Sequence, residues 1–209
     1  MGSLSSEPHK SRFGSNSLSS VAKEYGSAIV IDVETTGLDA SRHEILELAM
    51  ILFRFDRMSG QVLGKYVGLQ EPSREIPSGA TAIHGISYDM VEGRALNSHR
   101  IRQLFGKAEF IVAHNARFDH SFVTQLYPET ANMIWLCSML QINWKSYGYP
   151  SRALQSLLIT HRLSVKESHR AYYDCQGVLL LLDSKNPRGE RYFKELLGRL
   201  PYRKREAYL

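Results

Sequence analysis

Apolar residues form three runs in the first third of the chain, and each run is typical of a β-strand. The runs cover residues 28–33, 45–55 and 61–69 and are rich in Ile, Val, Leu and Phe. Residues 56–60, between the second and third runs, contain Asp, Ser and Gly, which favour a tight turn. The pattern therefore predicts three strands at the start of the domain, the last two joined by a turn.

Beyond residue 70 the pattern changes to helical spacing interrupted by short buried runs. A loop comes first, and it is marked by Pro72, Pro77, Gly79 and Gly85. The periodicity then predicts, in chain order, a helix near 94–107, a strand at 110–113, a helix at 116–127, a strand at 133–136, and helices at 151–160, 170–184 and 190–197. Strands in a run followed by alternating strands and helices indicate one α/β domain, with a mixed sheet flanked by helices.

The composition fits a soluble protein of this class. The chain has 209 residues, of which 43% are hydrophobic and 22% charged, so a full core is available. Its apolar runs are far shorter than the roughly 20 residues of a membrane helix. Two cysteines, Cys137 and Cys175, cannot form a disulfide framework, and no early segment resembles a secretory signal. We therefore expect a cytoplasmic protein that does not bind membranes.

Charge divides the chain into three parts. Residues 1–26 are rich in serine and predict a flexible leader, whereas residues 27–184 are almost neutral and form the expected domain. Residues 185–209, an expected helical extension, hold eight basic and three acidic side chains and carry the net charge of +5. Such a segment attracts phosphate backbones. It also fits a solvated face whose apolar residues pack on the domain or on a second subunit, namely Leu197, Leu200, Tyr202 and Tyr208.

Two acids interrupt the first apolar strand. Asp32 and Glu34 are separated by one residue, so on a strand both side chains point to the same face, a few ångströms apart. Two adjacent carboxylates repel each other unless one is protonated or a cation bridges them. Oxygen ligands at this spacing suit Mg²⁺ or Mn²⁺. The alternative is a strand that leaves the core and meets solvent at this point.

Further acids occur in two later segments. Asp119 falls on the packed side of the helix expected at 116–127, where an unpaired carboxylate would be costly. Asp174 borders the apolar face of the helix expected at 170–184. His169 precedes that helix, and its ordinary pKa of about 6.5 suits a general base. Each of these residues alone is also compatible with a surface position.

Three motifs in order resemble those of a known family. They are Asp-Val-Glu-Thr-Thr-Gly at 32–37, His-Asn-Ala-Arg-Phe-Asp at 114–119, and His-Arg-Ala-Tyr-Tyr-Asp at 169–174. Over residues 28–183 the chain resembles the DEDDh-type 3′–5′ exonucleases, the family of the proofreading subunit of bacterial DNA polymerase III. A sister subfamily would have Tyr at position 170, where this chain has Arg170. Cys175 and the Cys-Ser pair at 137–138 depart from the family pattern, outside the expected metal ligands.

The resemblance implies a ribonuclease H-like fold, a five-stranded mixed sheet flanked by helices. It implies that Asp32, Glu34, Asp119 and Asp174 hold two divalent metal ions, Mg²⁺ or Mn²⁺, and that His169 is the general base. These five residues would be the catalytic set. The expected reaction hydrolyses the 3′ end of single-stranded DNA or RNA and releases nucleoside 5′-monophosphates.

The resemblance also places the substrate end at two loops. The backbone after Glu34 would approach the terminal sugar, with no side chain at Gly37 to obstruct it, and Leu38 would wedge against the last base. His84 and Asn115 would donate to phosphate or sugar, although either suits a structural hydrogen bond equally. The expected substrate-binding residues are Thr35, Thr36, Gly37, Leu38, His84 and Asn115.

Three other functions compete with the exonuclease hypothesis. A phosphodiesterase acting on very short RNA would use the same acids. A binding module without catalysis would lack at least one acid, and all four are present. A proofreading subunit would need a segment that binds a polymerase, and residues 201–209 are the candidate. The expected partners are therefore nucleic acid and, as open alternatives, a polymerase or a second copy of the chain.

Overall fold

The computed structural model describes residues 26–56, 60–167, 169–206 and 208, so the leader expected at 1–26 lies outside the described residues except for Gly26. The strands are β1 (Gly26–Thr35), β2 (Ile45–Phe55), β3 (Gly60–Leu69), β4 (Phe110–Ala113) and β5 (Ile134–Cys137). They form one sheet in the order β3-β2-β1-β4-β5. β1 pairs antiparallel with β2 and parallel with β4, which confirms the five-stranded mixed sheet.

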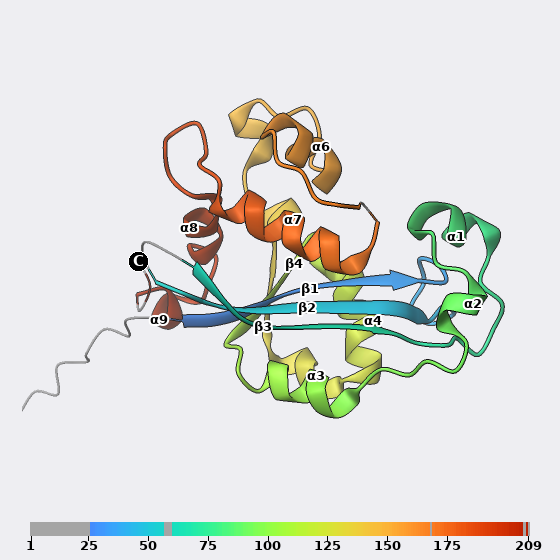
Figure 1. Ribbon diagram of the computed structural model, residues 1–209. Coiled ribbons are helices and arrows are strands. Elements are labelled where there is room, and N and C mark those ends of the chain that lie inside the picture. Colours follow the sequence, from blue (N-terminus) through green and yellow to red (C-terminus); the bar gives the residue numbers. More distant parts are fainter. Residues whose placement is uncertain (1–25, 57–59, 168, 207, 209) are drawn as a thin grey trace, which may run out of the picture.

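Helices cover both faces of the sheet (Figure 1). One face is covered by α6 (Leu154–Thr160), α7 (Ala171–Asp183) and α8 (Tyr192–Leu197), and the other by α3 (Ser98–Phe105) and α4 (Ala116–Leu126). The remaining helical elements are α1 (Ser78–His84), α2 (Tyr88–Val91), α5 (Ser138–Gln141), α9 (Tyr202–Arg205) and the 3₁₀ turns Pro128–Asn132 and Trp144–Tyr147. In the part of the chain that the structure describes, no helix has the length and apolar character needed to span a membrane.

Strand β1 supplies both cores through the alternation of its side chains. Ala28 and Val30 pack on the α7 side, whereas Ile29, Ile31 and Val33 pack toward α3 and α4. The strand continues two residues beyond the predicted end at residue 33 and stays paired with β2 through Thr35. The acids at positions 32 and 34 therefore stand on the face that α7 covers.

The segment expected as a loop at residues 72–93 contains two short helices, which the prediction missed. Pro77 is the N-cap of α1, and Gly85 ends the helix in the left-handed region with φ of 71°. This Pro-before, Gly-after arrangement is a helix signal rather than only a loop signal. The next helix starts at Ser98 instead of residue 94, because the Asn97 side chain accepts a hydrogen bond from the backbone N–H of Arg100 at 3.0 Å.

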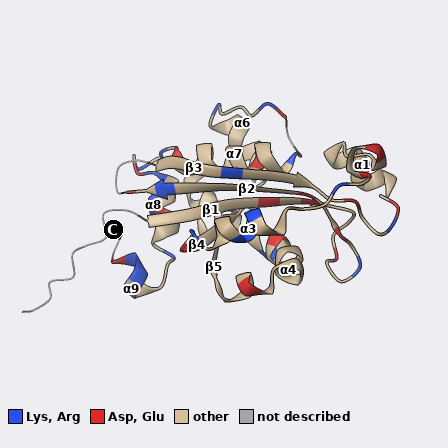
Figure 2. Cartoon of the chain, turned by 60° about the horizontal axis from the view of Figure 1, so that its bottom comes forward, with Lys and Arg blue, Asp and Glu red and all other residues tan. Residues whose placement is uncertain are grey.

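The C-terminal segment packs on the domain at the start of β1. Leu197, Leu200 and Tyr208 are buried in the core that contains Phe55, as the packing alternative predicted, but Tyr202 is 63% exposed. The basic helix α9 lies at the opposite end of the sheet from α1 (Figure 2). This end is the one where β1 begins.

Candidate active site

Three acidic side chains meet at the carboxyl end of β1. Asp32 and Glu34 come from the strand, and Asp174 comes from the first turn of α7. Each offers a carboxylate oxygen such that the three oxygens lie within 4.8 Å of one another. The one-residue spacing in the sequence thus places Asp32 and Glu34 side by side, and helix packing adds Asp174.

Asp119 approaches the same place from the opposite side of the sheet. It lies in the first turn of α4, directly after β4, and is 1% exposed. Its Oδ1 is buried without a hydrogen-bond partner among the described residues. Asp119 is not part of the group of three oxygens, yet its charge raises the pKa of Asp32. Because Asp119 is near enough to Asp32 for its charge to matter, it is the fourth acid at this place.

Burial and mutual repulsion keep these acids from ionising at their ordinary pH. Burial raises the pKa of Glu34 to about 8, with the charges of Asp174 and Glu47 adding to the rise. Burial likewise raises the pKa of Asp119 to about 8 and that of Asp32 well above its usual range. The pKa of Asp174 rises less, because His169 and a hydrogen bond from Gln155 oppose the effect of burial.

This donor set fits a divalent cation. The ligand atoms are carboxylate oxygens, which Mg²⁺ and Mn²⁺ prefer, and the unpartnered Oδ1 of Asp119 has capacity for a further contact. Burial and mutual repulsion raise the pKa values of these acids, and the nearby positive charges of Arg170 and His169 offset this only in part. A bound cation would therefore lower these pKa values and allow the four carboxylates to ionise together.

His169 stands next to the acids on the loop that enters α7. Its side chain is exposed, and its backbone is in the left-handed region with φ of 55°. Both its charge and its backbone N–H lower the pKa of Asp174, so the two residues are neighbours. The structure thus places the predicted general base at the edge of the cluster, open to solvent.

The turn after Glu34 uses its hydroxyl groups internally. The Thr35 hydroxyl donates to the carbonyl of Gly37 at 2.6 Å, and the Thr36 hydroxyl accepts from the backbone N–H of Glu44 at 3.0 Å. A side chain at Gly37 would run into the His43 ring, which is a packing reason for glycine that sequence reasoning missed. Leu38, in contrast, is 85% exposed. The Thr36 N–H also donates to the carbonyl of Glu44 at 2.9 Å, so the side chain of Leu38 is the group in residues 35–38 that is most open to another molecule.

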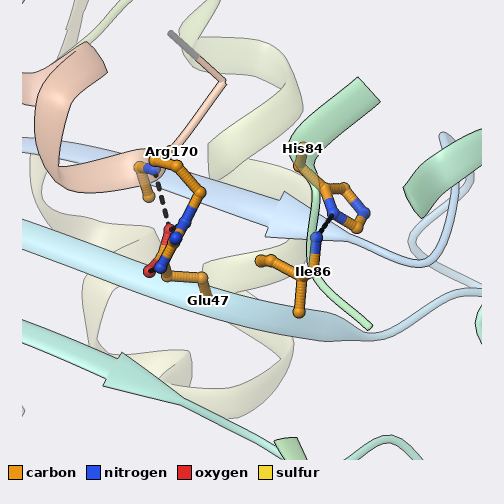
Figure 3. A network of polar contacts seen from close by, with 5 residues as sticks. Glu47, His84, Ile86 and Arg170 are labelled. Atoms are coloured by element: carbon orange, nitrogen blue, oxygen red, sulfur yellow. Dashed lines mark hydrogen bonds and ion pairs between the residues drawn. The ribbon is translucent and has the colours of Figure 1, made fainter. Parts of the chain in front are cut away.

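The two remaining predicted residues differ in their surroundings. His84 is 5% exposed; its Nδ1 accepts from the backbone N–H of Ile86 at 3.0 Å, while Nε2 has no partner among the described residues (Figure 3). Asn115 is exposed, in the left-handed region with φ of 76°, directly before α4. The His84 ring is thus buried, with the backbone of Thr35 near enough to raise its pKa against the lowering effect of burial, whereas Asn115 is accessible.

Sequence reasoning missed three residues that hold the site in place. Glu47 of β2 accepts two hydrogen bonds from the Arg170 guanidinium, one from its Nη2 at 2.7 Å and one from its Nε at 3.1 Å (Figure 3). Gln155 of α6 donates to Oδ1 of Asp174 at 2.8 Å. The only signal for Glu47 was an acid inside an otherwise apolar run, and Gln155 gave none.

Comparison with known proteins agrees with this arrangement. The family model described as exonuclease matches residues 29–182. Exodeoxyribonuclease 10 of Escherichia coli strain K12 is 32% identical over 168 residues, which cover 77% of this chain and 69% of that protein. A DNA polymerase III PolC-type protein of Thermotoga petrophila is 30% identical over 141 residues, which cover 66% of this chain but 9% of that protein.

Solved structures show the same fold. Exonuclease X in complex with 5′ overhanging duplex DNA is 28% identical, with a TM-score of 0.55 over 73% of this chain and 88% of that chain. E. coli exonuclease I in complex with a dT13 oligonucleotide reaches a TM-score of 0.66 at 19% identity, over 86% and 45% of the two chains. The mixed sheet and these neighbours confirm the ribonuclease H-like fold. The chain belongs to the exonuclease family, whose members are nucleases that act on nucleic-acid ends.

Proposed function

We propose that the protein is a metal-dependent 3′-to-5′ exonuclease that releases nucleoside 5′-monophosphates from single-stranded ends. One observation carries the proposal: the carboxylates of Asp32, Glu34 and Asp174 converge within 4.8 Å, with Asp119 buried beside them and His169 exposed at their edge. Four acids held together, two buried and two half-buried, repel one another when ionised, and a cation would compensate that charge. An adjacent solvent-accessible histidine supplies the base that a hydrolysis requires.

Asp32, Glu34, Asp119 and Asp174 would hold the metal, as two divalent ions. When bound, the ions neutralise the acids, lower the pKa of the attacking water and stabilise the charge that develops on the scissile phosphate. Asp119 is suited to this role because its unpartnered Oδ1 lies beside Asp32, whose pKa it raises. Loss of any one acid removes part of a shared set of ligands.

The chain's own groups would carry out the remaining steps. His169 accepts the proton of the attacking water, and the neighbouring Asp174 carboxylate stabilises the imidazolium that results. The water oxygen bonds to phosphorus, the bond from phosphorus to the 3′-oxygen of the preceding nucleotide breaks, and that oxygen takes up a proton from solvent. The terminal nucleotide then carries a 5′-phosphate.

Recognition of the end would fall to the turn after Glu34. Exposed Leu38 is free to pack against the terminal base, and the backbone of Gly37 would contact its sugar. Thr35 and Thr36 would hold this turn in place through their hydroxyls and the Thr36 N–H. The exposed side chain of Asn115 would donate to the substrate. The ring of His84 is buried beside the backbone of Thr35, so His84 would act by holding this turn. The DNA held by the 28% identical exonuclease X supports DNA as the first substrate to test.

The test compares 5′-labelled single-stranded DNA, duplex DNA and RNA with Mg²⁺ and with Mn²⁺. We expect stepwise shortening of at least one of these substrates from its 3′ end. EDTA and the Asp32→Ala substitution should each abolish this activity. His169→Ala should lower kcat by about 10²–10⁴ with little change in Mn²⁺ affinity. Glu190→Gln, at an exposed acid outside the site, is the control. Full activity in EDTA or in Asp32→Ala would contradict the proposal.

A further inference from the structure

Two carboxylates face each other across β1 and β2 at the site. Glu34 and Glu47 are directly paired in the antiparallel register, so their side chains lie on the same face of the sheet. Like charges in this position repel, and Glu47 indeed raises the pKa of Glu34. Glu47 is 1% exposed, so solvent does not screen it. Its negative charge therefore needs a specific partner within the protein.

The partner is the start of helix α7. The Arg170 guanidinium donates to both oxygens of Glu47, at 2.7 Å and 3.1 Å, and the backbone N–H of Ala171 donates to Oε2 at 2.9 Å. Arg170 also lowers the pKa of Glu34, so its positive charge acts on both glutamates. One buried carboxylate of β2 thus fixes the first residues of α7 onto the sheet (Figure 3).

We propose that Glu47 and Arg170 form a positioning pair that sets His169 and Asp174 for the reaction. The inference rests on the proposed function. Arg170 lies between the two: it follows His169 directly, and its carbonyl accepts the backbone N–H of Asp174 at 3.1 Å. The backbone of His169, immediately before Arg170, is in the left-handed region. The direction of the imidazole therefore depends on where Arg170 is held.

The geometry separates this role from that of a metal ligand. Both oxygens of Glu47 already accept hydrogen bonds, three in all, and the group of converging ligand oxygens comprises Asp32, Glu34 and Asp174 without Glu47. Removing the pair should therefore displace His169 and Asp174 without deleting any ligand oxygen. The expected result is a lower kcat with nearly unchanged KM, and a loss of metal affinity smaller than the loss caused by removing a ligand.

The experiment is a double-mutant cycle of Glu47→Gln and Arg170→Gln. Glu47→Gln keeps the size of the side chain and removes its charge, and Arg170→Lys keeps the charge but removes the fork. We expect each single variant to lower kcat by about 10–100-fold, the range for residues that orient a metal site, with KM changed less than threefold. The double variant should be no slower than the slower single variant, because the two residues act as one unit.

Controls separate positioning from stability. Glu129→Gln breaks the exposed pair with Arg102, whose atoms lie 2.8 Å apart, and should leave kcat unchanged. All rates are measured well below the melting temperature of each variant. If Glu47→Gln does not fold, Arg170→Lys alone tests the proposal, because Arg170 is only partly buried and its charge is kept. A kcat reduction of about tenfold in Arg170→Lys, with KM unchanged, would support it.

Other outcomes overturn the inference. A wild-type rate for Glu47→Gln, or multiplicative losses in the double variant, would show that the pair does not position the site. A loss of Mn²⁺ affinity in Glu47→Gln as large as that in Asp32→Ala, with kcat restored at high Mn²⁺, would identify Glu47 as a ligand instead. Inactivity of the wild-type protein on every nucleic acid would overturn the proposed function, which is a separate failure.

Discussion

Glu34 retains its proton to a higher pH in the folded chain than an ordinary carboxylate does, because burial raises its pKa to about 8. Below about pH 4 both the folded and the unfolded chain bind this proton. Between about pH 4 and 8 only the folded chain retains it, so the free energy of unfolding falls as pH rises, and it levels off above about 8. Asp119 acts in the same direction.

The prediction concerns the metal-free protein in EDTA. Between pH 5 and pH 8 the melting temperature of wild type should fall by several degrees more than that of Glu34→Gln, which has no proton to lose at this position. The readout is thermal unfolding followed by circular dichroism. Glu129→Gln, at an exposed carboxylate, should follow wild type. Equal pH dependence in wild type and Glu34→Gln would contradict the prediction.

Gln155 offers a second prediction at this scale. Its amide donates to Oδ1 of Asp174 at 2.8 Å and helps to keep that carboxylate ionised, since the bond lowers the pKa of Asp174. Gln155→Met, which keeps the length of the side chain but has no amide, should lower kcat by about 10–100-fold at fixed Mg²⁺. Gln155→Leu, which is shorter and also lacks the amide, should behave in the same way. Gln155→Asn, with a shorter reach, should also be impaired, whereas Ser156→Ala on the same helix is the control. An unchanged rate for Gln155→Leu would show that Asp174 needs no such support.

Sequence separation distinguishes the site residues that were predicted from those that were missed. Asp32 and Glu34 are one residue apart, so strand geometry alone brings them together. Glu47 and Arg170 are 123 residues apart, and Gln155 and Asp174 act between two helices. Neither pairing leaves a pattern in a single sequence, because the first exists only once α7 packs on β2 and the second only once α6 packs on α7.

At the scale of elements, helices α6 and α7 pack closely at a glycine. A Cβ on Gly177 of α7 would lie 2.8 Å from a methyl carbon of Leu158 on α6, the helix that also carries Gln155. Gly177→Val should push the two helices apart and cost about 1–3 kcal/mol of unfolding free energy. Because Gln155 moves with α6, kcat should fall as well.

Leu158→Ala provides the matched second change. Alone it should destabilise by about 2–5 kcal/mol through the cavity it leaves. Combined with Gly177→Val it should cost less than the sum of the two single changes, because the added methyl groups fill the space vacated by Leu158. Strict additivity in chemical denaturation would show that the two side chains do not compete for this space.

Elements with strong periodicity were predictable, and those that depend on caps were not. The strand at 110–113 and the start of the helix at Ala116 match the structure. Helices α1 and α2 were missed because they are short, so hydrophobic periodicity has too few residues to register. The start of α3 was misplaced because a single side chain, Asn97, decides it.

For the whole molecule, the acids and the basic C-terminal segment lie at opposite ends of β1. Gly26, at the start of the strand, packs against Tyr208, and Glu34 lies eight residues farther along, which is about 25 Å at the rise of a strand. Two of the basic side chains donate to backbone carbonyls of the domain: Arg199 to Gln141 at 3.0 Å and Lys204 to Glu109 at 3.3 Å. This geometry favours packing on the domain as the role of the C-terminal segment, rather than contact with a nucleic-acid strand in the active site.

Two variants separate packing of the segment from nucleic-acid binding. Deleting residues 199–209 removes buried Leu200 and Tyr208 and should lower the melting temperature by several degrees, since each loss costs a few kcal/mol. Replacing Arg199, Lys204 and Arg205 by Gln keeps both apolar residues and should leave stability nearly unchanged. In neither variant should the slope of log K against log salt for a short single strand change, whereas three lost phosphate contacts would reduce that slope by about 2. A reduced slope in the triple-Gln variant would show instead that the basic residues bind the strand, because that variant leaves the packing intact.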